Sequence, residues 1–155
     1  SFAVEAEKLD AEELVRFAAE SHEPLAAQKG QRIVSEIASP LPLICGDRDR
    51  LLQVFGNLIG NAIKFTPERG TITVEATRDG SCVRFRVRDT GPGIPEADLK
   101  NVFRPYWQAK KTAHMGAGLG LAIVRGIIEA HGGKVWAGNE PRGGAVFTFT
   151  VPTVE

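Results

Sequence analysis

Two amides and one ammonium group recur at helical spacing near the middle of the chain. Asn57, Asn61 and Lys64 stand at positions i, i+4 and i+7, and at about 100° per residue they form one polar strip about 60° wide on an otherwise apolar segment. Amide oxygens are ligands for a hard cation such as Mg²⁺, and an ammonium group attracts phosphate. The alternative is the solvent-facing side of an amphipathic helix, although asparagine is a poor helix former.

A second candidate is the segment DTGPGI over residues 89–94, which follows directly after a predicted strand. The carboxylate of Asp89 can accept a hydrogen bond from an exocyclic amine, which selects adenine over guanine because guanine carries a carbonyl oxygen at that position. Gly91 and Gly93 allow the backbone to approach a ligand closely. The alternative is an Asx turn closed by Pro-Gly.

A third candidate is the segment GAGLG over residues 116–120, which leads into a predicted apolar helix. Backbone N–H groups at the N-terminus of a helix bind anions. The dinucleotide-binding pattern does not fit, because it needs Gly or Ala at position 121 and a strand just before it, whereas the chain has Leu121 and a loop. The P-loop pattern does not fit either, since the chain has no Gly-Lys-Ser/Thr triplet. These glycines could therefore hold phosphate, but by neither of those routes.

The spacing of apolar residues predicts three helices, over residues 10–30, 47–65 and 119–130, and a short helix near 96–103. The third helix is apolar on nearly every side, which predicts that it is buried. Strand patterns occupy residues 31–37, 71–77, 83–88, 134–137 and 145–151. Because most strands are joined by short turns, we expect an α+β two-layer sandwich with a mainly antiparallel or mixed sheet, in preference to a doubly wound parallel sheet.

Three arginines, Arg84, Arg86 and Arg88, alternate with apolar residues along one predicted strand. Such a basic row could contact a nucleic acid. We expect instead that the row is a solvated face whose arginines pair across the hairpin with Glu75.

Composition limits the classes of protein to which the chain can belong. It has 155 residues, 19 basic and 19 acidic side chains and no formal net charge, which suits a single domain over residues 1–155. The balanced charge argues against a nucleic-acid-binding module and a polybasic membrane anchor, and no apolar run approaches the ~20 residues of a bilayer span. Cys45 and Cys82 are expected to be free thiols in a reducing compartment.

The order and spacing of these segments resemble the catalytic and ATP-binding domain of bacterial two-component sensor histidine kinases, within the GHKL ATPase superfamily. Four boxes of that family have counterparts along the chain, and the closing GGAVFTFTVP resembles its final hairpin. The resemblance covers residues 8–152. The boxes are the N box at 49–67, the G1 box DTGPGI at 89–94, the F box FRPYWQ at 103–108 and the G2 box GAGLGL at 116–121.

The resemblance implies a Bergerat-type ATP-binding fold, in which a mixed sheet of about five strands is covered on one face by three helices. It also implies roles for the residues of the N box. Asn61 would coordinate Mg²⁺ that bridges the ATP phosphates, with assistance from Asn57, and Lys64 would touch the phosphates. Asn57 and Lys64 would therefore act in catalysis, and Phe65 would line the adenine pocket.

The resemblance assigns the remaining boxes to the nucleotide as well. Asp89 would bind the adenine amino group, and Thr148 would reach the adenine through water. Residues 108–117 would form a mobile ATP lid. The residues that would shape the pocket wall are Gly91, Gly93 and Ile94, and those that would contact phosphates are Lys110, Lys111, Gly116, Gly118, Leu119 and Gly120.

One departure bears on the reaction. The true ATPases of the superfamily place a glutamate one turn before the metal-binding asparagine to activate water, and this chain has Asn57 there, an amide that cannot act as a general base. The resemblance therefore implies transfer of the γ-phosphoryl of Mg-ATP to a separate acceptor. The alternatives are an ATPase-type conformational switch of the same superfamily and a nucleotide-binding module without phosphotransfer.

The family's acceptor histidine lies on a preceding dimerisation domain, for which the chain has no counterpart. His22 is rejected as the acceptor, because Pro24 follows almost at once and the N box begins too soon for a helical hairpin. The expected partners are thus a histidine-bearing dimerisation domain of the same parent protein and a response regulator downstream, without nucleic acid or direct membrane contact. The resemblance implies a cytoplasmic domain and leaves a membrane-anchored parent protein open.

Overall fold

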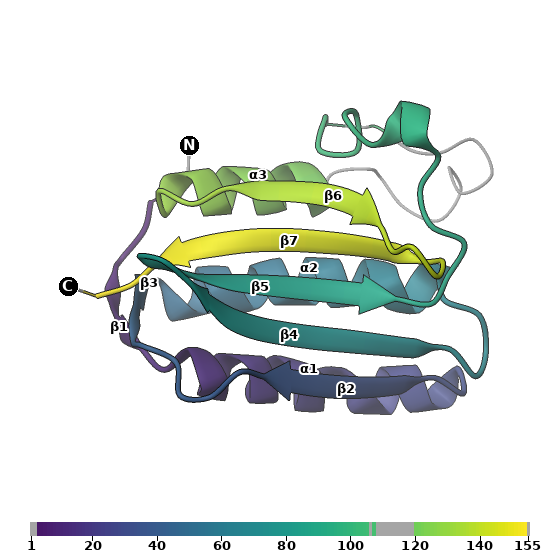
Figure 1. Cartoon of the computed structure of the whole chain (residues 1–155), viewed down its shortest axis with the longest axis horizontal. Helices are drawn as coiled ribbons and strands as arrows, with labels where there is room; N and C mark the ends of the chain where they lie inside the picture. Colours follow the sequence, from purple (N-terminus) through teal and green to yellow (C-terminus); the bar gives the residue numbers. More distant parts are fainter. Residues whose placement is uncertain (1–2, 106, 108–119, 155) are drawn as a thin grey trace.

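A five-stranded sheet forms one layer of the protein (Figure 1). The computed structural model describes residues 3–105, 107 and 120–154. Strands β2 and β4 run parallel, whereas the other neighbouring pairs run antiparallel, so the sheet is mixed. In spatial order the strands are β2 (Arg32–Ile37), β4 (Thr71–Asp79), β5 (Cys82–Asp89), β7 (Ala145–Pro152) and β6 (Val135–Asn139).

Three helices, α1 (Ala11–Gln28), α2 (Arg48–Phe65) and α3 (Gly120–Ala130), form the second layer and cover one face of this sheet (Figure 1). The buried core lies between the layers. Its centre is a cluster in which the ring of Phe55 on α2 packs edge-on against those of Phe85 and Phe149, with centroids 5.4 and 5.2 Å away. The predicted α+β sandwich, with three helices on one face of a five-stranded mixed sheet, is confirmed.

The two long helices begin at aspartates that cap them. The Asp10 carboxylate accepts the N–H groups of Glu12 and Glu13, at 2.9 and 3.2 Å. The Asp47 carboxylate accepts the N–H of Arg50 at 3.2 Å. Because such caps satisfy donors that a helix leaves unpaired, they fix where each helix starts. The start of α2 in turn fixes which of its side chains face the core and which lie along its polar strip.

Three features differ from expectation. Strands β1 (Glu7–Leu9) and β3 (Ile44–Gly46) form a second, two-stranded sheet, which the sequence does not predict because three residues are too few to reveal an alternation. The short helix near 96–103 is reduced to a 3₁₀ turn, η1 (Glu96–Asp98). Helix α3 is only partly buried: Val124, Ile127 and Ile128 are enclosed, whereas the first turn borders an open pocket.

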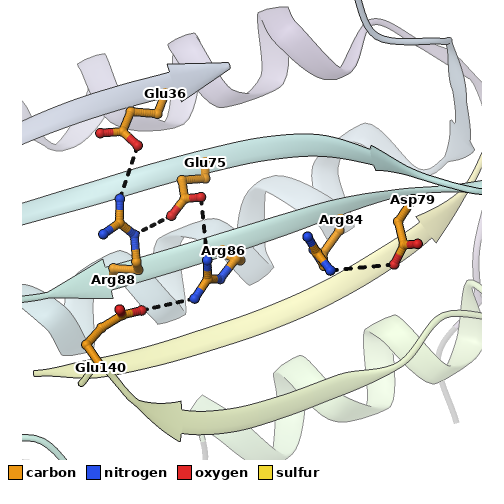
Figure 2. A network of polar contacts seen from close by, with 7 residues as sticks. All are labelled: Glu36, Glu75, Asp79, Arg84, Arg86, Arg88 and Glu140. Atoms are coloured by element: carbon orange, nitrogen blue, oxygen red, sulfur yellow. Dashed lines mark hydrogen bonds and ion pairs between the residues drawn. The ribbon is translucent and has the colours of Figure 1, made fainter. Parts of the chain in front are cut away.

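The sheet face that the helices leave uncovered carries a network of ion pairs (Figure 2). Glu75 of β4 lies between Arg86 and Arg88 of β5 and pairs with both. Arg86 also contacts Glu140 at 3.0 Å, and Arg88 contacts Glu36 at 3.1 Å. The predicted pairing with Glu75 is confirmed for Arg86 and Arg88, whereas Arg84 pairs with Asp79 at 3.7 Å instead.

Candidate functional site

A pocket opens where the C-terminal part of α2, the loop after β5 and the first turn of α3 meet. The space between its atoms is about 690 Å³, with open solvent at its mouth included. Among the described residues the walls are mostly apolar, and the polar side chains that line the pocket include the amide of Asn61 and the carboxylate of Asp89. The lining residues are Asn61, Ala62, Phe65, Asp89, Pro92, Gly93, Ile94, Pro95, Val102, Trp107, Leu121, Ala145 and Phe147.

Asp89 ends strand β5 and brings a carboxylate into this apolar pocket. The residue is 8% exposed, and burial raises the pKa of its carboxyl, while hydrogen bonds from two backbone groups oppose that shift. Both donors, the N–H groups of Gly91 and Ala145, lie on Oδ1, at 2.9 and 3.2 Å. Among the described residues Oδ2 receives no such bond, so that oxygen is available to a ligand donor.

The loop after Asp89 packs closely against the end of α2. A Cβ atom at position 91 would lie 2.8 Å from the backbone oxygen of Phe65. A residue larger than glycine would therefore push the end of α2 away. Further along, Gly93 has φ +79°, in the region that favours glycine. The Ile94 N–H donates to Asn139 Oδ1 at 2.8 Å. The predicted wall residues Gly93 and Ile94 therefore line the pocket, and Gly91 sets its distance from α2.

The polar strip of α2 lies beside the start of α3. Asn57 and Asn61 are half-buried, and Asn61 lines the pocket. The Nδ2 group of Asn57 donates to the carbonyl of Gly120 at 3.0 Å. This bond directs the amide nitrogen of Asn57 to the helix start and leaves its oxygen as an acceptor. The predicted N-box asparagines and the last G2-box glycine are thus brought together.

The final turn of α2 carries Lys64 and Phe65 and is held from outside the helix. Lys64 is exposed, whereas Phe65 lines the pocket. The Lys29 ammonium donates to the carbonyls of Ile63 and Lys64, at 2.7 and 2.9 Å, and the buried Gln31 amide donates to Ile63 at 3.0 Å and to a neighbouring carbonyl. These bonds satisfy carbonyls that the helix end leaves unpaired, so the turn bearing the two predicted residues is fixed.

Thr148 does not reach the pocket. It lies in register with Arg86 of β5 and Trp136 of β6, whereas its neighbour Phe147 lines the pocket. Because successive side chains of a strand point to opposite faces, Thr148 belongs to the uncovered face of the sheet. Thr148, which the resemblance assigns to adenine through water, is therefore not among the described residues that line the pocket.

Some predicted contacts lie outside the described residues. These are the lid at 108–117 and the residues Lys110, Lys111, Gly116, Gly118 and Leu119.

Sequence reasoning missed most of the apolar wall and one polar residue. Val102, Trp107 and Phe147 line the pocket from three separate segments, and nothing in their local pattern distinguishes them from core residues. Asn139 was missed because an asparagine at the end of a strand is typical of an ordinary turn. Its bond to a residue 45 positions away becomes visible only in the fold.

The donor set fits a purine nucleotide with a magnesium ion. A carboxylate oxygen that accepts no hydrogen bond from the described residues suits an exocyclic amine, and the apolar walls suit a base. The amide oxygens of Asn57 and Asn61 are suitable for Mg²⁺, which usually takes few protein ligands and completes its shell with phosphates and water. Among the described residues there is no cluster of three or more His, Cys, Asp or Glu side chains that could hold a metal alone.

A mixed sheet, three helices on one face and an aspartate in an apolar pocket between the layers define a nucleotide-binding α+β domain. The chain belongs to the family described as histidine kinase-, DNA gyrase B- and HSP90-like ATPase, which matches residues 46–155. No helix in the described part of the chain is long and apolar enough to cross a membrane.

The curated relatives are sensor kinases. The adaptive-response sensory kinase SasA of Nostoc sp. (strain PCC 7120) is 40% identical over 126 residues, which make up 80% of this chain and 31% of SasA. The chain thus spans about a third of the length of that relative.

Solved structures place the chain among histidine kinase catalytic domains. Full-length ShkA in complex with AMPPNP matches with a TM-score of 0.88 and 41% identity, over 99% of this chain and 32% of ShkA. The nucleotide-free catalytic domain of histidine kinase ThkA matches with a TM-score of 0.86 and 34% identity, over 97% of this chain and 99% of that domain. ThkA has also been solved in complex with the response regulator protein TrrA. The chain is therefore a catalytic ATPase domain of the histidine kinase type.

Proposed function

We propose that this domain binds Mg-ATP and transfers the γ-phosphoryl group to a histidine on a separate dimerisation domain of the same sensor kinase. The observation that carries the proposal is the position of Asp89 in an apolar pocket next to Asn61 of α2, with both of its hydrogen bonds from the described residues on Oδ1. The AMPPNP complex of ShkA supports ATP as the nucleotide.

Each residue at the pocket has one task in this proposal. Asp89 accepts a hydrogen bond from the adenine amino group, and Phe65 and Ile94 pack on the base. Asn61, assisted by Asn57, holds Mg²⁺, which when bound neutralises charge on the phosphates. Lys64 and the backbone at Gly120 face the phosphates, and with Lys110 and Lys111 they orient the γ-phosphoryl group for attack.

The residues of α2 favour transfer over hydrolysis. Asn57 occupies the position where a general base would activate water, and its amide nitrogen is committed to the carbonyl of Gly120. An amide has no proton affinity suited to that role. Hydrolysis is therefore disfavoured. In this proposal an acceptor histidine is the nucleophile, and the domain works by positioning and charge neutralisation.

The ThkA complex with TrrA supports a response regulator as the next partner in the sequence of transfer. We place the domain in the cytoplasm, where ATP and such regulators are found.

A transfer assay tests the proposal. The domain is incubated with γ-labelled ATP and Mg²⁺, with and without an added histidine-bearing dimerisation domain of its parent kinase. Label on the added domain is the expected result, and it should disappear when the acceptor histidine is replaced by glutamine. Asn61→Asp should weaken Mg²⁺-dependent binding or transfer.

The same assay discriminates the alternatives. Free phosphate released at the same rate without the acceptor would favour an ATPase-type switch. Tight nucleotide binding with neither transfer nor release would favour a binding module. Full transfer by Asn61→Asp would contradict the metal assignment.

A further inference from the structure

One wall of the pocket is the loop over residues 89–94, and hydrogen bonds hold this loop at both ends. Its first anchor is the Asp89 carboxylate, whose Oδ1 atom accepts the N–H of Ala145 at 3.2 Å. Its second anchor is the backbone of Ile94, which Asn139 binds. Asn139 and Ala145 face each other as partners in the β6–β7 ladder. One cross-strand pair therefore holds both the carboxylate and the apolar wall of the pocket.

The contact between Asn139 and Ile94 is a double one. The Ile94 N–H donates to Asn139 Oδ1 at 2.8 Å, and Asn139 Nδ2 donates to the Ile94 carbonyl at 2.7 Å. The side-chain amide thus supplies one donor and one acceptor to a single residue, as a neighbouring strand would do. Such a pair restricts both the position and the rotation of the Ile94 peptide groups.

The loop fits closely around this contact. A Cβ atom at Gly93 would lie 2.8 Å from Asn139 Oδ1, so the amide occupies the space that any larger side chain at position 93 would need. Gly93 also has φ +79°. A side chain at position 93 would therefore strain the backbone and displace the Asn139 amide.

We propose that Asn139 is a positioning residue for nucleotide binding: its amide fixes the gap between Asp89 and Ile94 in which the base lies. The inference rests on the proposed function, because it takes a purine base as the occupant of the pocket. Asn139 contacts neither the reacting phosphate nor the acceptor. It acts through Ile94, and its loss should affect ATP affinity far more than the rate at saturating ATP.

The exposure of Asn139 makes it suitable for substitution. The residue lies at the solvent-exposed end of β6, so Asn139→Ala removes two hydrogen bonds without opening the core. Because both bonds lie within the protein, their free energy limits the loss of affinity, which we expect to be about tenfold. Arg142→Ala, at the exposed tip of the same hairpin, is the matched control.

The experiment measures three quantities on the wild-type domain and both variants: the dissociation constant for ATP by calorimetry, the exchange rate of the Ile94 amide proton by NMR, and KM and kcat for transfer to the added dimerisation domain. For Asn139→Ala we expect a dissociation constant and KM about tenfold higher, faster Ile94 exchange, and kcat within about twofold of wild type. Arg142→Ala should match wild type in all three.

The outcomes separate the inference from the proposed function. Wild-type protein that binds no ATP would overturn the proposed function and the inference with it. Wild-type protein that binds ATP, with an Asn139→Ala variant of equal affinity, would overturn the inference alone. A variant that loses kcat and KM together, with a lowered melting temperature, would show a general structural role and would also overturn it.

Discussion

At the scale of single residues, two opposing effects act on the pKa of Asp89. Burial in an apolar pocket raises the pKa of its carboxyl, and two backbone N–H groups on Oδ1 stabilise the charged form. The net shift is upward, so the charged form of the carboxyl costs more free energy in the fold than in a free aspartate. A ligand amine that donates to Oδ2 would remove part of that cost, which couples nucleotide binding to the protonation of one residue.

The first prediction concerns the substitution Asp89→Asn. The amide oxygen can still accept the N–H groups of Gly91 and Ala145, which turns the new NH₂ group toward the ligand. A donor then meets the adenine amine, so the hydrogen bond is lost and both groups are left unpaired. We expect ATP affinity to fall about 10- to 100-fold, measured by calorimetry.

The control for this substitution is Asp98→Asn, a change of the same chemistry in the 3₁₀ turn η1. It should leave the affinity for ATP unchanged. Wild-type affinity in Asp89→Asn would show that the carboxylate does not contact the nucleotide.

The second prediction concerns pH. The ordinary pKa of an aspartate is 3.8 and that of folded Asp89 is higher, so the folded state binds the proton more tightly than the unfolded state does. The contribution of Asp89 to the free energy of unfolding should therefore fall as pH rises from 3.8 through the raised pKa, and ATP affinity should fall as pH drops through that same raised value.

Urea unfolding of wild type and of Asp89→Asn, from roughly pH 3.5 to pH 7, would measure the contribution of Asp89 to the free energy of unfolding. This range begins near the ordinary pKa of an aspartate and ends at neutrality. The difference between the two proteins isolates the residue. A difference independent of pH would mean that the pKa of Asp89 is the same in both states.

At the scale of elements, the side chains on the uncovered face of the sheet pair with one another. Glu75 is 14% exposed and pairs with two arginines, and each arginine has a second carboxylate. Pairs in a network cost less side-chain entropy than isolated ones and are partly shielded from water. The face therefore needs no covering layer, which explains how a two-layer fold can leave one side of a sheet to solvent.

The third prediction follows from this network. Glu75→Gln removes the charge shared by Arg86 and Arg88, and we expect the free energy of unfolding to fall by about 1 to 2 kcal/mol. The control is Asp79→Asn, whose carboxylate is 57% exposed and contacts Arg84 at 3.7 Å, and it should cost less than about 0.5 kcal/mol. Equal losses in denaturant unfolding would show that the network adds nothing beyond separate surface pairs.

The elements also show which parts of the fold a sequence can reveal. Strands β4 and β5 were predictable because buried apolar side chains recur at every second position, from Ile72 to Ala76 and from Val83 to Val87. The pairing of β1 with β3 was not, because each has three residues and the partners are distant in sequence. The α2 strip and the Asp89 loop were recognisable from residue type and spacing, whereas Asn139 and Phe147 enter the site only through sheet register.

At the scale of the whole molecule, the pocket joins parts that the chain order separates. Its walls come from α2, the loop after β5, the first turn of α3 and β7. A ligand in it contacts both layers, so binding should stabilise the domain as one unit. The helix layer and the sheet would then be linked through the ligand as well as through the core.

The fourth prediction is a rise in melting temperature with ATP. At a concentration 100 times the dissociation constant, binding adds about 2.7 kcal/mol, which corresponds to roughly 5–10 °C for a domain of this size. Differential scanning fluorimetry with Mg²⁺ and a non-hydrolysable ATP analogue measures it. Asp89→Asn should show little or no shift at the same concentration, and a full shift in that variant would contradict the assigned site.

Strand β3 receives both ends of the described chain: β1 pairs with it, Thr153 bridges to Ile44, and the Val154 N–H donates to Leu43 just before it. The eight residues of β5 run from this end of the sheet to Asp89, a span of about 25 Å at 3.3 Å per residue. A segment that continues from either end must cover that span to reach Asp89, where the proposed function places the base. A tether shorter than about eight extended residues would therefore not extend from this end of the sheet to the base-binding end of the pocket.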